Sequence, residues 1–193
     1  MQVQKFYHVY NHANGDENLF KEPENYDYFL KQWSKYIDPI ADPMAYCLMP
    51  KHFHFLVQIK SSEDFKNIKA AKSQSTEKII SQSFSNLFNS YTKAFNKRYE
   101  RKGSLFSPNF KKKEITTNDY LTKAIAYIHT NPIHHGFSKD LMSWKYTSYN
   151  SIISDQATKL ARQKILNWFG GQEAFKDFHL SYINTFSQLE YTL

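Results

Sequence analysis

In the first third of the chain, the spacing of hydrophobic residues is first typical of a strand, then of a helix, and then of strands again. Residues 5–13 (KFYHVYNHA) are rich in aromatic and β-branched side chains and end at the turn-forming residues NGD. Residues 23–37 instead carry apolar side chains at helical spacing before a proline. Two short apolar runs follow at 43–49 and 53–59, with a bend at Pro50. The pattern predicts a strand, a helix and two more strands.

The remaining two thirds of the chain are predicted to be mostly helical. Residues 61–76 are polar and predict a loop or a short helical piece, and residues 80–99 form a long amphipathic helix. Residues 101–115 predict extended chain broken by a proline. Residues 117–132 begin with a capping signal, and we expect this helix to end at its proline because the residue before proline avoids helical geometry. Residues 151–193 contain two amphipathic patterns split by two glycines.

This order of elements predicts the fold class. Strands that are neighbours in the sequence can pair as hairpins while the helices gather on one face of the sheet. We therefore expect an α+β fold, a ferredoxin-like sandwich with a mainly antiparallel sheet, helices on one face and a C-terminal helical tail. The main domain is predicted to span residues 1–150 and the tail residues 151–193.

Composition indicates which binding partners and which cellular compartment to expect. The 193 residues carry a formal charge of +7, which favours a polyanionic partner such as nucleic acid or an acidic membrane surface. No apolar run reaches the ~18 residues that a membrane span needs, and the N-terminus lacks the apolar core of a signal peptide. We expect a cytoplasmic protein without a membrane partner. The one cysteine, Cys47, lies in an apolar run and is expected to be buried and inert.

Two histidines interrupt the most apolar stretch, MPKHFHFLV at 49–57. Because side chains alternate along a strand, Phe53 and Phe55 face the core while His52 and His54 project together from the other face. Their backbones are ~7 Å apart by strand rise, a spacing from which two imidazoles can converge on one ion. Most His-x-His pairs on strands are instead half-exposed or hydrogen-bonded, and a metal site needs a third ligand from elsewhere.

The helix YLTKAIAYIHTNP at 120–132 carries the second set of candidate residues. Beside its apolar stripe, Tyr120, Lys123, Tyr127 and Asn131 follow one another at spacings of three and four along a neighbouring face. Tyr127 and Asn131 are one turn apart. The alternative is structural: Tyr127 packs at the rim of the core, Asn131 caps the helix, and Lys123 is solvated.

Four motifs in order, YCLMPKHFHFLV, GSLFSPNFKKKEI, YIHTNPIHHGF and WKYTSY, resemble the single-tyrosine HUH transposases of the insertion-sequence-200 type. The resemblance covers about residues 5–150 and is closest to the REP-associated tyrosine transposases. It implies a metal-dependent endonuclease and strand transferase that acts on single-stranded DNA with hairpin or palindromic structure. A covalent 5′-phosphotyrosine intermediate is implied, and a monomer is favoured over a dimer.

The resemblance also implies roles for individual residues. Tyr127 is implied as the nucleophile. His52, His54 and Asn131 are implied to bind a divalent ion, for which phosphate chemistry favours Mg²⁺ or Mn²⁺. Lys123, four residues before Tyr127, can favour the phenolate or contact phosphate.

A basic segment between residues 93 and 113 contains eight cationic side chains and a single acid. Such a run is either a solvated face or a phosphate track, and we expect it to contact DNA. The predicted DNA-binding residues are Lys93, Lys97, Arg98, Arg101, Lys102, Lys111, Lys112 and Lys113, together with Lys123. Tyr99, Phe106 and Phe110 are interleaved with these charges and either stack on bases or belong to the core.

Two other functions compete with the transposase interpretation. One is a noncatalytic protein that holds hairpin nucleic acid, which would not need Tyr127 or the two histidines. The other is a hydrolytic metal phosphoesterase that uses the histidines alone. The presence of all three side chains favours the tyrosine enzyme.

Overall fold

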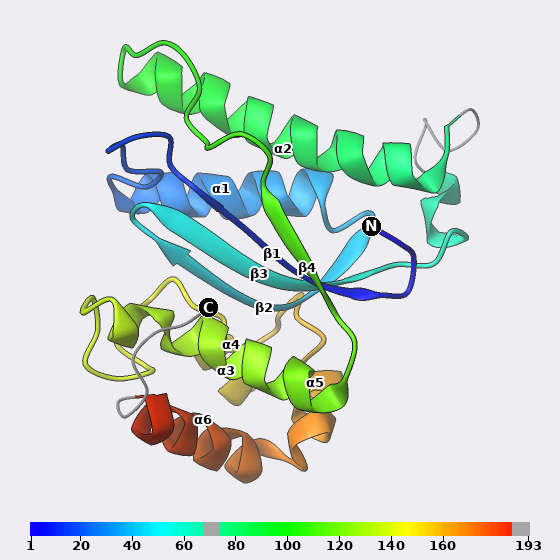
Figure 1. Ribbon diagram of the computed structural model, residues 1–193, viewed down its shortest axis with the longest axis vertical. Helices are drawn as coiled ribbons and strands as arrows, with labels where there is room; N and C mark the ends of the chain where they lie inside the picture. Colours follow the sequence, from blue (N-terminus) through cyan, green and yellow to red (C-terminus); the bar gives the residue numbers. More distant parts are fainter. Residues whose placement is uncertain (68–73, 187–193) are drawn as a thin grey trace.

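A four-stranded sheet forms the middle layer of the protein (Figure 1). The computed structural model describes residues 1–67 and 74–186. Each pair of neighbouring strands is antiparallel, and the order across the sheet is β2-β3-β1-β4. The strands are β1 (Phe6–His12), β2 (Ala41–Met49), β3 (His52–Ile59) and β4 (Lys111–Ile115). This confirms the predicted α+β fold with a mainly antiparallel sheet.

Helices cover both faces of this sheet (Figure 1). On one face lie α1 (Pro23–Tyr36) and α2 (Thr76–Arg98). On the opposite face lie α3 (Asn118–His134), α4 (Tyr149–Ile153), α5 (Arg162–Phe169) and α6 (Gln172–Phe186). The prediction that all helices gather on one face is therefore wrong in this respect. A short 3₁₀ helix, η1 (Asp64–Asn67), lies in the segment predicted as a loop or a short helical piece, and residues 68–73 of that segment fall outside the described part.

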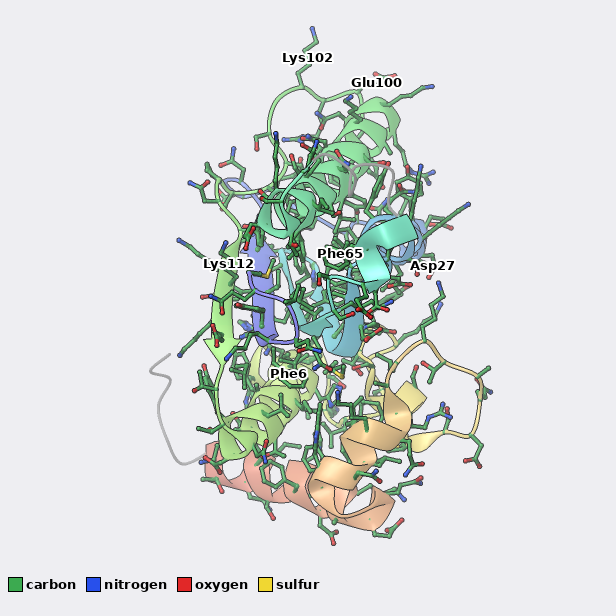
Figure 2. All side chains as sticks on the ribbon, turned by 90° about the vertical axis from the view of Figure 1, so that its right-hand side faces the viewer. Phe6, Asp27, Phe65, Glu100, Lys102 and Lys112 are labelled. Atoms are coloured by element: carbon green, nitrogen blue, oxygen red, sulfur yellow. The ribbon has the colours of Figure 1, made fainter. Side chains whose placement is uncertain are left out.

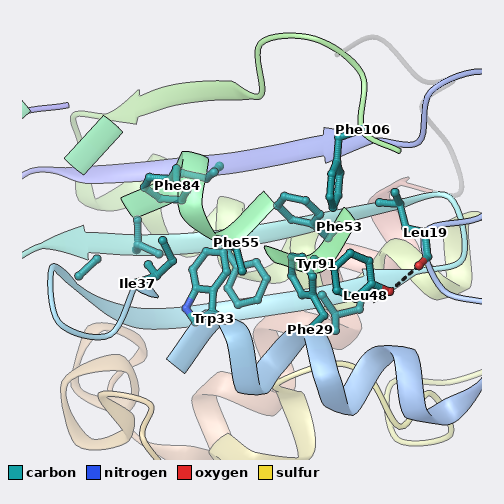
Figure 3. Packing of buried hydrophobic residues seen from close by; sticks show 14 of the residues in the cluster. Leu19, Phe29, Trp33, Ile37, Leu48, Phe53, Phe55, Phe84, Tyr91 and Phe106 are labelled. Carbon is teal, nitrogen blue, oxygen red and sulfur yellow. Dashed lines mark hydrogen bonds between the residues drawn. The ribbon is translucent and has the colours of Figure 1, made fainter. Parts of the chain in front are cut away.

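The first core lies between the sheet and helices α1 and α2. Phe53 and Phe55 of β3 point into it, as the alternation predicted, and the Trp33 ring stacks on Phe55 at 3.5 Å between centroids (Figure 3). The Tyr91 hydroxyl, buried among these rings, donates a 2.6 Å hydrogen bond to the carbonyl of Leu19. This aromatic layer holds β3 in place and so fixes which of its side chains face the other way.

The second core lies between the sheet and α3. Cys47 and Leu56 contribute from the strands, Ile125 from α3, and Ile165 and Phe175 from α5 and α6. These apolar side chains on the second sheet face require cover from helices, which is why α3 and the C-terminal helices pack there. Burial raises the pKa of the Cys47 thiol well above its ordinary value, so the thiol stays protonated, as predicted for an inert cysteine.

Helix α3 continues past the proline that was expected to end it. Pro132 lies inside the helix, which extends to His134. Side chains stabilise this last turn, because Asn131 Nδ2 donates a 2.9 Å hydrogen bond to the carbonyl of Tyr127 and the imidazole of His134 contacts the hydroxyl of Thr130 at 2.9 Å. The continuation matters for the site because it gives Asn131 helical geometry one turn after Tyr127.

Across residues 1–67 and 74–186, no helix combines the length and the apolar composition that spanning a bilayer would demand.

Candidate active site

Strand β3 presents His52 and His54 to the sheet face that α3 covers. Both side chains are buried, with 7% and 5% of their surface exposed. The antiparallel register places His12 of β1 directly opposite His52 and Tyr10 directly opposite His54. Cross-strand partners share a sheet face, so β1 adds polar rings beside both predicted ligands.

Strand β1 contributes two imidazoles that the sequence analysis did not select. The Nε2 atom of His8 lies 2.9 Å from Nδ1 of His54, and both rings are buried. The ring of His12 lies 5.0 Å from that of His52, measured between centroids. The signal was present in the sequence, since His8, Tyr10 and His12 are spaced by two in a predicted strand and must share one face.

Helix α3 brings Tyr127 and Asn131 over the histidines. The Tyr127 ring lies 5.6 Å from the ring of His54 and 6.0 Å from that of His8, edge-on to both. Asn131 is 1% exposed, its Nδ2 donates to the carbonyl of Tyr127, and its side chain also hydrogen-bonds with His52, which brings its amide beside the histidines. Just past the helix, the ring of His135 lies 4.9 Å from that of His52. All four residues implied for catalysis and metal binding therefore meet in one place.

Burial keeps the imidazoles of His8, His52 and His54 uncharged. Loss of solvation lowers the pKa of His52 to about 4, assisted by the neighbouring His12 and His135 and opposed by the side chain of Asn131. Burial, with a smaller contribution from Lys113, also lowers the pKa of His8 to about 4, and burial holds the pKa of His54 well below its ordinary range. A neutral imidazole has a lone pair for a metal ion, whereas an imidazolium has none.

The imidazoles of His52 and His54 and the amide of Asn131 form a donor set that suits a divalent ion. In the described part of the chain, no three or more His, Cys, Asp or Glu side chains are grouped to hold an ion. A site here would therefore depend on the amide oxygen of Asn131 as its third protein ligand. Imidazole nitrogen with amide oxygen is a borderline set that suits Mn²⁺ and similar ions as well as Mg²⁺.

Three of the predicted DNA-binding lysines lie on β4. The register pairs Lys113 with His8 and Lys111 with Tyr10, so these two share the histidine face. Lys112 points to the other face at the sheet edge, where Figure 2 labels it. The ammonium of Lys113 lies 5.1 Å from the centre of the Tyr120 ring, and its hydrogen bond with Tyr120 raises the Lys113 pKa.

The other basic residues of that segment lie across the sheet from Tyr127. They belong to α2 and the loop after it, and they are Lys93, Lys97, Arg98, Arg101 and Lys102. Figure 2 places Lys102 at the end of the molecule far from Phe6 and α3. Arg98 forms a 2.5 Å ion pair with Glu22, and Arg101 forms a 3.3 Å ion pair with Glu17. The basic run is therefore divided, because α2 packs against the sheet face opposite α3 while β4 belongs to the sheet itself.

The remaining candidate side chains in this region have structural contacts. Phe106 belongs to the first core at 6% exposure, and the ring of Phe110 stacks on Phe84 at 4.9 Å. The Tyr99 hydroxyl donates to the side chains of Glu22 and Asn25. The ammonium of Lys123 is exposed and forms a 2.8 Å ion pair with Asp119, one turn earlier on α3. These contacts favour the core alternative for Phe106 and Phe110.

Comparison with known proteins agrees with the motifs and the fold. No family model matches the chain. A putative REP-associated tyrosine transposase from Haemophilus influenzae is 26% identical over 113 residues, which cover 56% of this chain and 59% of that protein. The structure of a REP-associated tyrosine transposase bound to a REP hairpin aligns with a TM-score of 0.59 and 13% identity, covering 80% of this chain and 82% of that one. The chain resembles the REP-associated tyrosine transposases.

The resemblance to REP-associated tyrosine transposases covers part of the relative's sequence and, in the structural comparison, the fold. The match spans about 59% of the length of the curated relative, and at 13% identity the structural alignment concerns the fold. Within that fold, the four candidate residues lie on two elements that face each other. His52 and His54 are on β3, and Tyr127 and Asn131 are on α3.

Behind Tyr127, a second pair of imidazoles joins α3 to α6. His129 Nδ1 lies 2.9 Å from His179 Nε2, and His129 Nε2 lies 2.7 Å from the hydroxyl of Ser148. His179 Nδ1 completes the chain with a 2.7 Å contact to the carbonyl of Phe175. Burial raises the pKa of Tyr182 on α6, and the neighbouring Tyr127 acts in the same direction. The C-terminal helix therefore packs close to the candidate nucleophile.

Proposed function

We propose that this protein is a metal-dependent single-stranded DNA endonuclease and strand transferase that acts on hairpin or palindromic DNA. The observation that carries the proposal is the position of the Tyr127 ring, 5.6 Å from the ring of His54, above two buried neutral histidines. The resemblance to proteins named as REP-associated tyrosine transposases supports DNA as the substrate and a hairpin as its form.

The proposed reaction begins with attack by the phenol oxygen of Tyr127 on a DNA phosphorus. A bond forms between that oxygen and the phosphorus, and the bond from phosphorus to the 3′ oxygen breaks. The phenol loses its proton, and the leaving 3′ oxygen takes one up. The products are a 5′-phosphotyrosine and a 3′-hydroxyl. Because the phosphotyrosine ester stores about the same energy as a phosphodiester, a 3′-hydroxyl can attack it and rejoin strands without ATP.

The protein supplies orientation and charge neutralisation for this reaction. His52, His54 and Asn131 would hold a Mg²⁺ or Mn²⁺ ion, and such an ion would supply Lewis-acid polarisation of a phosphate oxygen and help to orient the scissile bond. Packing of the Tyr127 ring against His8 and His54 fixes the approach of the nucleophile. Lys111 and Lys113 on the same sheet face supply positive charge for the DNA backbone. We further propose that a monomer performs the reaction.

The test uses labelled single-stranded oligonucleotides from palindromes that flank the gene, incubated with the full chain with and without Mn²⁺. Denaturing gels should show a cleaved strand and a protein–DNA adduct that depend on Mn²⁺. Tyr127→Phe should abolish both. The matched control is Tyr28→Phe, on α1 across the sheet from Tyr127, which should form the adduct at the wild-type rate.

Each alternative function predicts a different gel. Full-rate cleavage by Tyr127→Phe would contradict the proposal and support a metal hydrolase. Hairpin binding without any cleavage by the wild type would support a noncatalytic binding protein.

A further inference from the structure

The contact between His8 and His54 joins two buried imidazoles on neighbouring strands. His8 Nε2 lies 2.9 Å from His54 Nδ1, and the two rings are stacked at 5.1 Å with 29° between their planes. His8 is 9% exposed and His54 is 5% exposed. A hydrogen bond this well shielded from water holds both rings in one orientation.

A hydrogen bond between two neutral imidazoles has a direction, because one nitrogen donates and the other accepts. If His8 Nε2 carried the hydrogen, His54 would have to carry its own hydrogen on Nε2. That atom could then bind no ion. If His54 Nδ1 donates to His8 Nε2 instead, the lone pair of His54 is left on Nε2, where an ion can bind.

We propose that His8 is a positioning residue that holds His54 in the Nδ1–H tautomer and so keeps the Nε2 lone pair available for the metal ion. The inference rests on the proposed function, because the ion decides which direction of the hydrogen bond is productive. Metal-binding histidines almost always donate their second nitrogen to an acceptor such as a carboxylate or a carbonyl. Here an imidazole has that role.

An imidazole acceptor differs from a carboxylate in charge. A carboxylate would add a negative charge beside an ion that must attract a DNA phosphate. His8 orients His54 without that charge, and the register places the cationic Lys113 directly opposite His8 on β4. This arrangement leaves the sheet face neutral or positive around the phosphate, as polyanion binding requires.

Two substitutions separate this role from simple packing. His8→Gln retains an acceptor, because the amide oxygen of glutamine reaches about as far from the backbone as Nε2 of histidine. His8→Phe keeps a ring but removes the acceptor, which leaves the buried Nδ1–H of His54 without a partner and favours the Nε2–H tautomer. The matched control is Tyr10→Phe, since the Tyr10 ring stacks on His54 at 5.5 Å and only its hydroxyl is lost.

The first measurement is the tautomer of His54 in the metal-free protein, read from two-bond nitrogen–proton correlation spectra of the full chain labelled with ¹⁵N-histidine. We expect the Nδ1–H tautomer in the wild type, His8→Gln and Tyr10→Phe, and the Nε2–H tautomer in His8→Phe. The second measurement is Mn²⁺ affinity by calorimetry. It should fall about 10- to 100-fold in His8→Phe and stay within about threefold in the other two variants.

The inference is overturned if wild-type His54 is in the Nε2–H tautomer, or if His8→Phe keeps both the wild-type tautomer and the wild-type Mn²⁺ affinity. Its failure can be told apart from failure of the proposed function. A protein that forms no Tyr127 adduct would contradict the enzyme, whereas the spectra of the metal-free protein would still decide the role of His8.

Discussion

His52 lies between two further imidazoles, those of His12 and His135, with ring centroids 5.0 and 4.9 Å away. His12 and His135 are exposed, whereas His52 is buried. Burial makes His52 the better-fixed ring of the three and so the better candidate ligand. The two exposed rings border the proposed ion site on its solvent side.

Loss of His52 should therefore remove the ion's contribution to catalysis. We expect His52→Ala to slow adduct formation by about a hundredfold or more, because a Lewis-acid ion is worth several kcal/mol to phosphate chemistry. Adduct formation on gels at saturating DNA measures this. Thr122→Ala is the control, since the Thr122 hydroxyl donates to backbone carbonyls in the first turn of α3, and it should retain the wild-type rate. Equal loss in both variants would contradict the assignment of His52.

The residues of the site were predictable from sequence to different degrees. His52 and His54 are recognisable because alternation along β3 fixes the face they share, and Tyr127 and Asn131 because helical spacing places them one turn apart. His8 also alternates on its strand, but the partner of β1 is set by long-range pairing, which no local pattern encodes. Its 2.9 Å contact with His54 therefore became visible only in the folded chain.

At the scale of elements, α3 depends on α6 for its position. The buried chain from Ser148 through His129 and His179 to the carbonyl of Phe175 is satisfied when both imidazoles are neutral. Burial lowers the pKa of His179 to about 4, and that of His129 lies well below its ordinary range. Protonation would place positive charge in this apolar layer and weaken the contact between the helices.

This buried pair predicts that stability falls on acidification. Below about pH 6.5 the unfolded chain binds a proton at His179, while the folded chain binds it only near pH 4. The free energy of unfolding should therefore decrease as the pH falls through this window, with His179 contributing about 2 kcal/mol between pH 7 and pH 5. Urea unfolding at the two pH values measures the loss.

The variant His179→Leu isolates that contribution. It lacks the titrating group, so its stability should fall less than that of the wild type between pH 7 and pH 5. An unchanged pH dependence in His179→Leu would show that this imidazole is not held neutral by burial.

Helix α3 also shows where local sequence rules fail. Proline disfavours helical geometry in the residue before it, yet Asn131 is helical and the helix continues through Pro132. Hydrogen bonds within the last turn and the burial of both residues outweigh the local preference. The element could be predicted from its pattern, whereas its end was decided by tertiary contacts.

At the scale of the whole molecule, the sheet separates two groups of candidate functional residues. The histidines, Tyr127, Lys111 and Lys113 lie on the α3 face, while α2 and its basic residues lie on the other (Figure 1). The sequence could not predict this separation, because residues 93–113 are contiguous. Their basic side chains lie on different faces because the apolar stripe of α2 packs into the first core, on the face opposite α3.

This separation predicts different effects for two pairs of lysines. The double variant Lys111→Ala/Lys113→Ala should weaken hairpin binding. The plot of the logarithm of the binding constant against the logarithm of the salt concentration should become shallower by about 1.4, because two phosphate contacts are lost. Adduct formation should also be slower, even at saturating DNA. Lys93→Ala with Lys97→Ala should weaken binding through distant phosphates and leave the adduct rate at saturating DNA unchanged. Binding titrations at several salt concentrations and adduct assays measure both. An equal loss of adduct rate in the two double variants would contradict the separation.

The measurement that tests the central claim most directly is the location of the covalent bond. The adduct is trapped with Mn²⁺, the DNA is trimmed with nuclease, and the protein is digested with trypsin for mass spectrometry. Cleavage after Lys123 and Lys139 releases a peptide, AIAYIHTNPIHHGFSK, whose single tyrosine is Tyr127. We predict that the residual nucleotide is on this peptide. A nucleotide on any other peptide, such as EITTNDYLTK with Tyr120, would contradict the account.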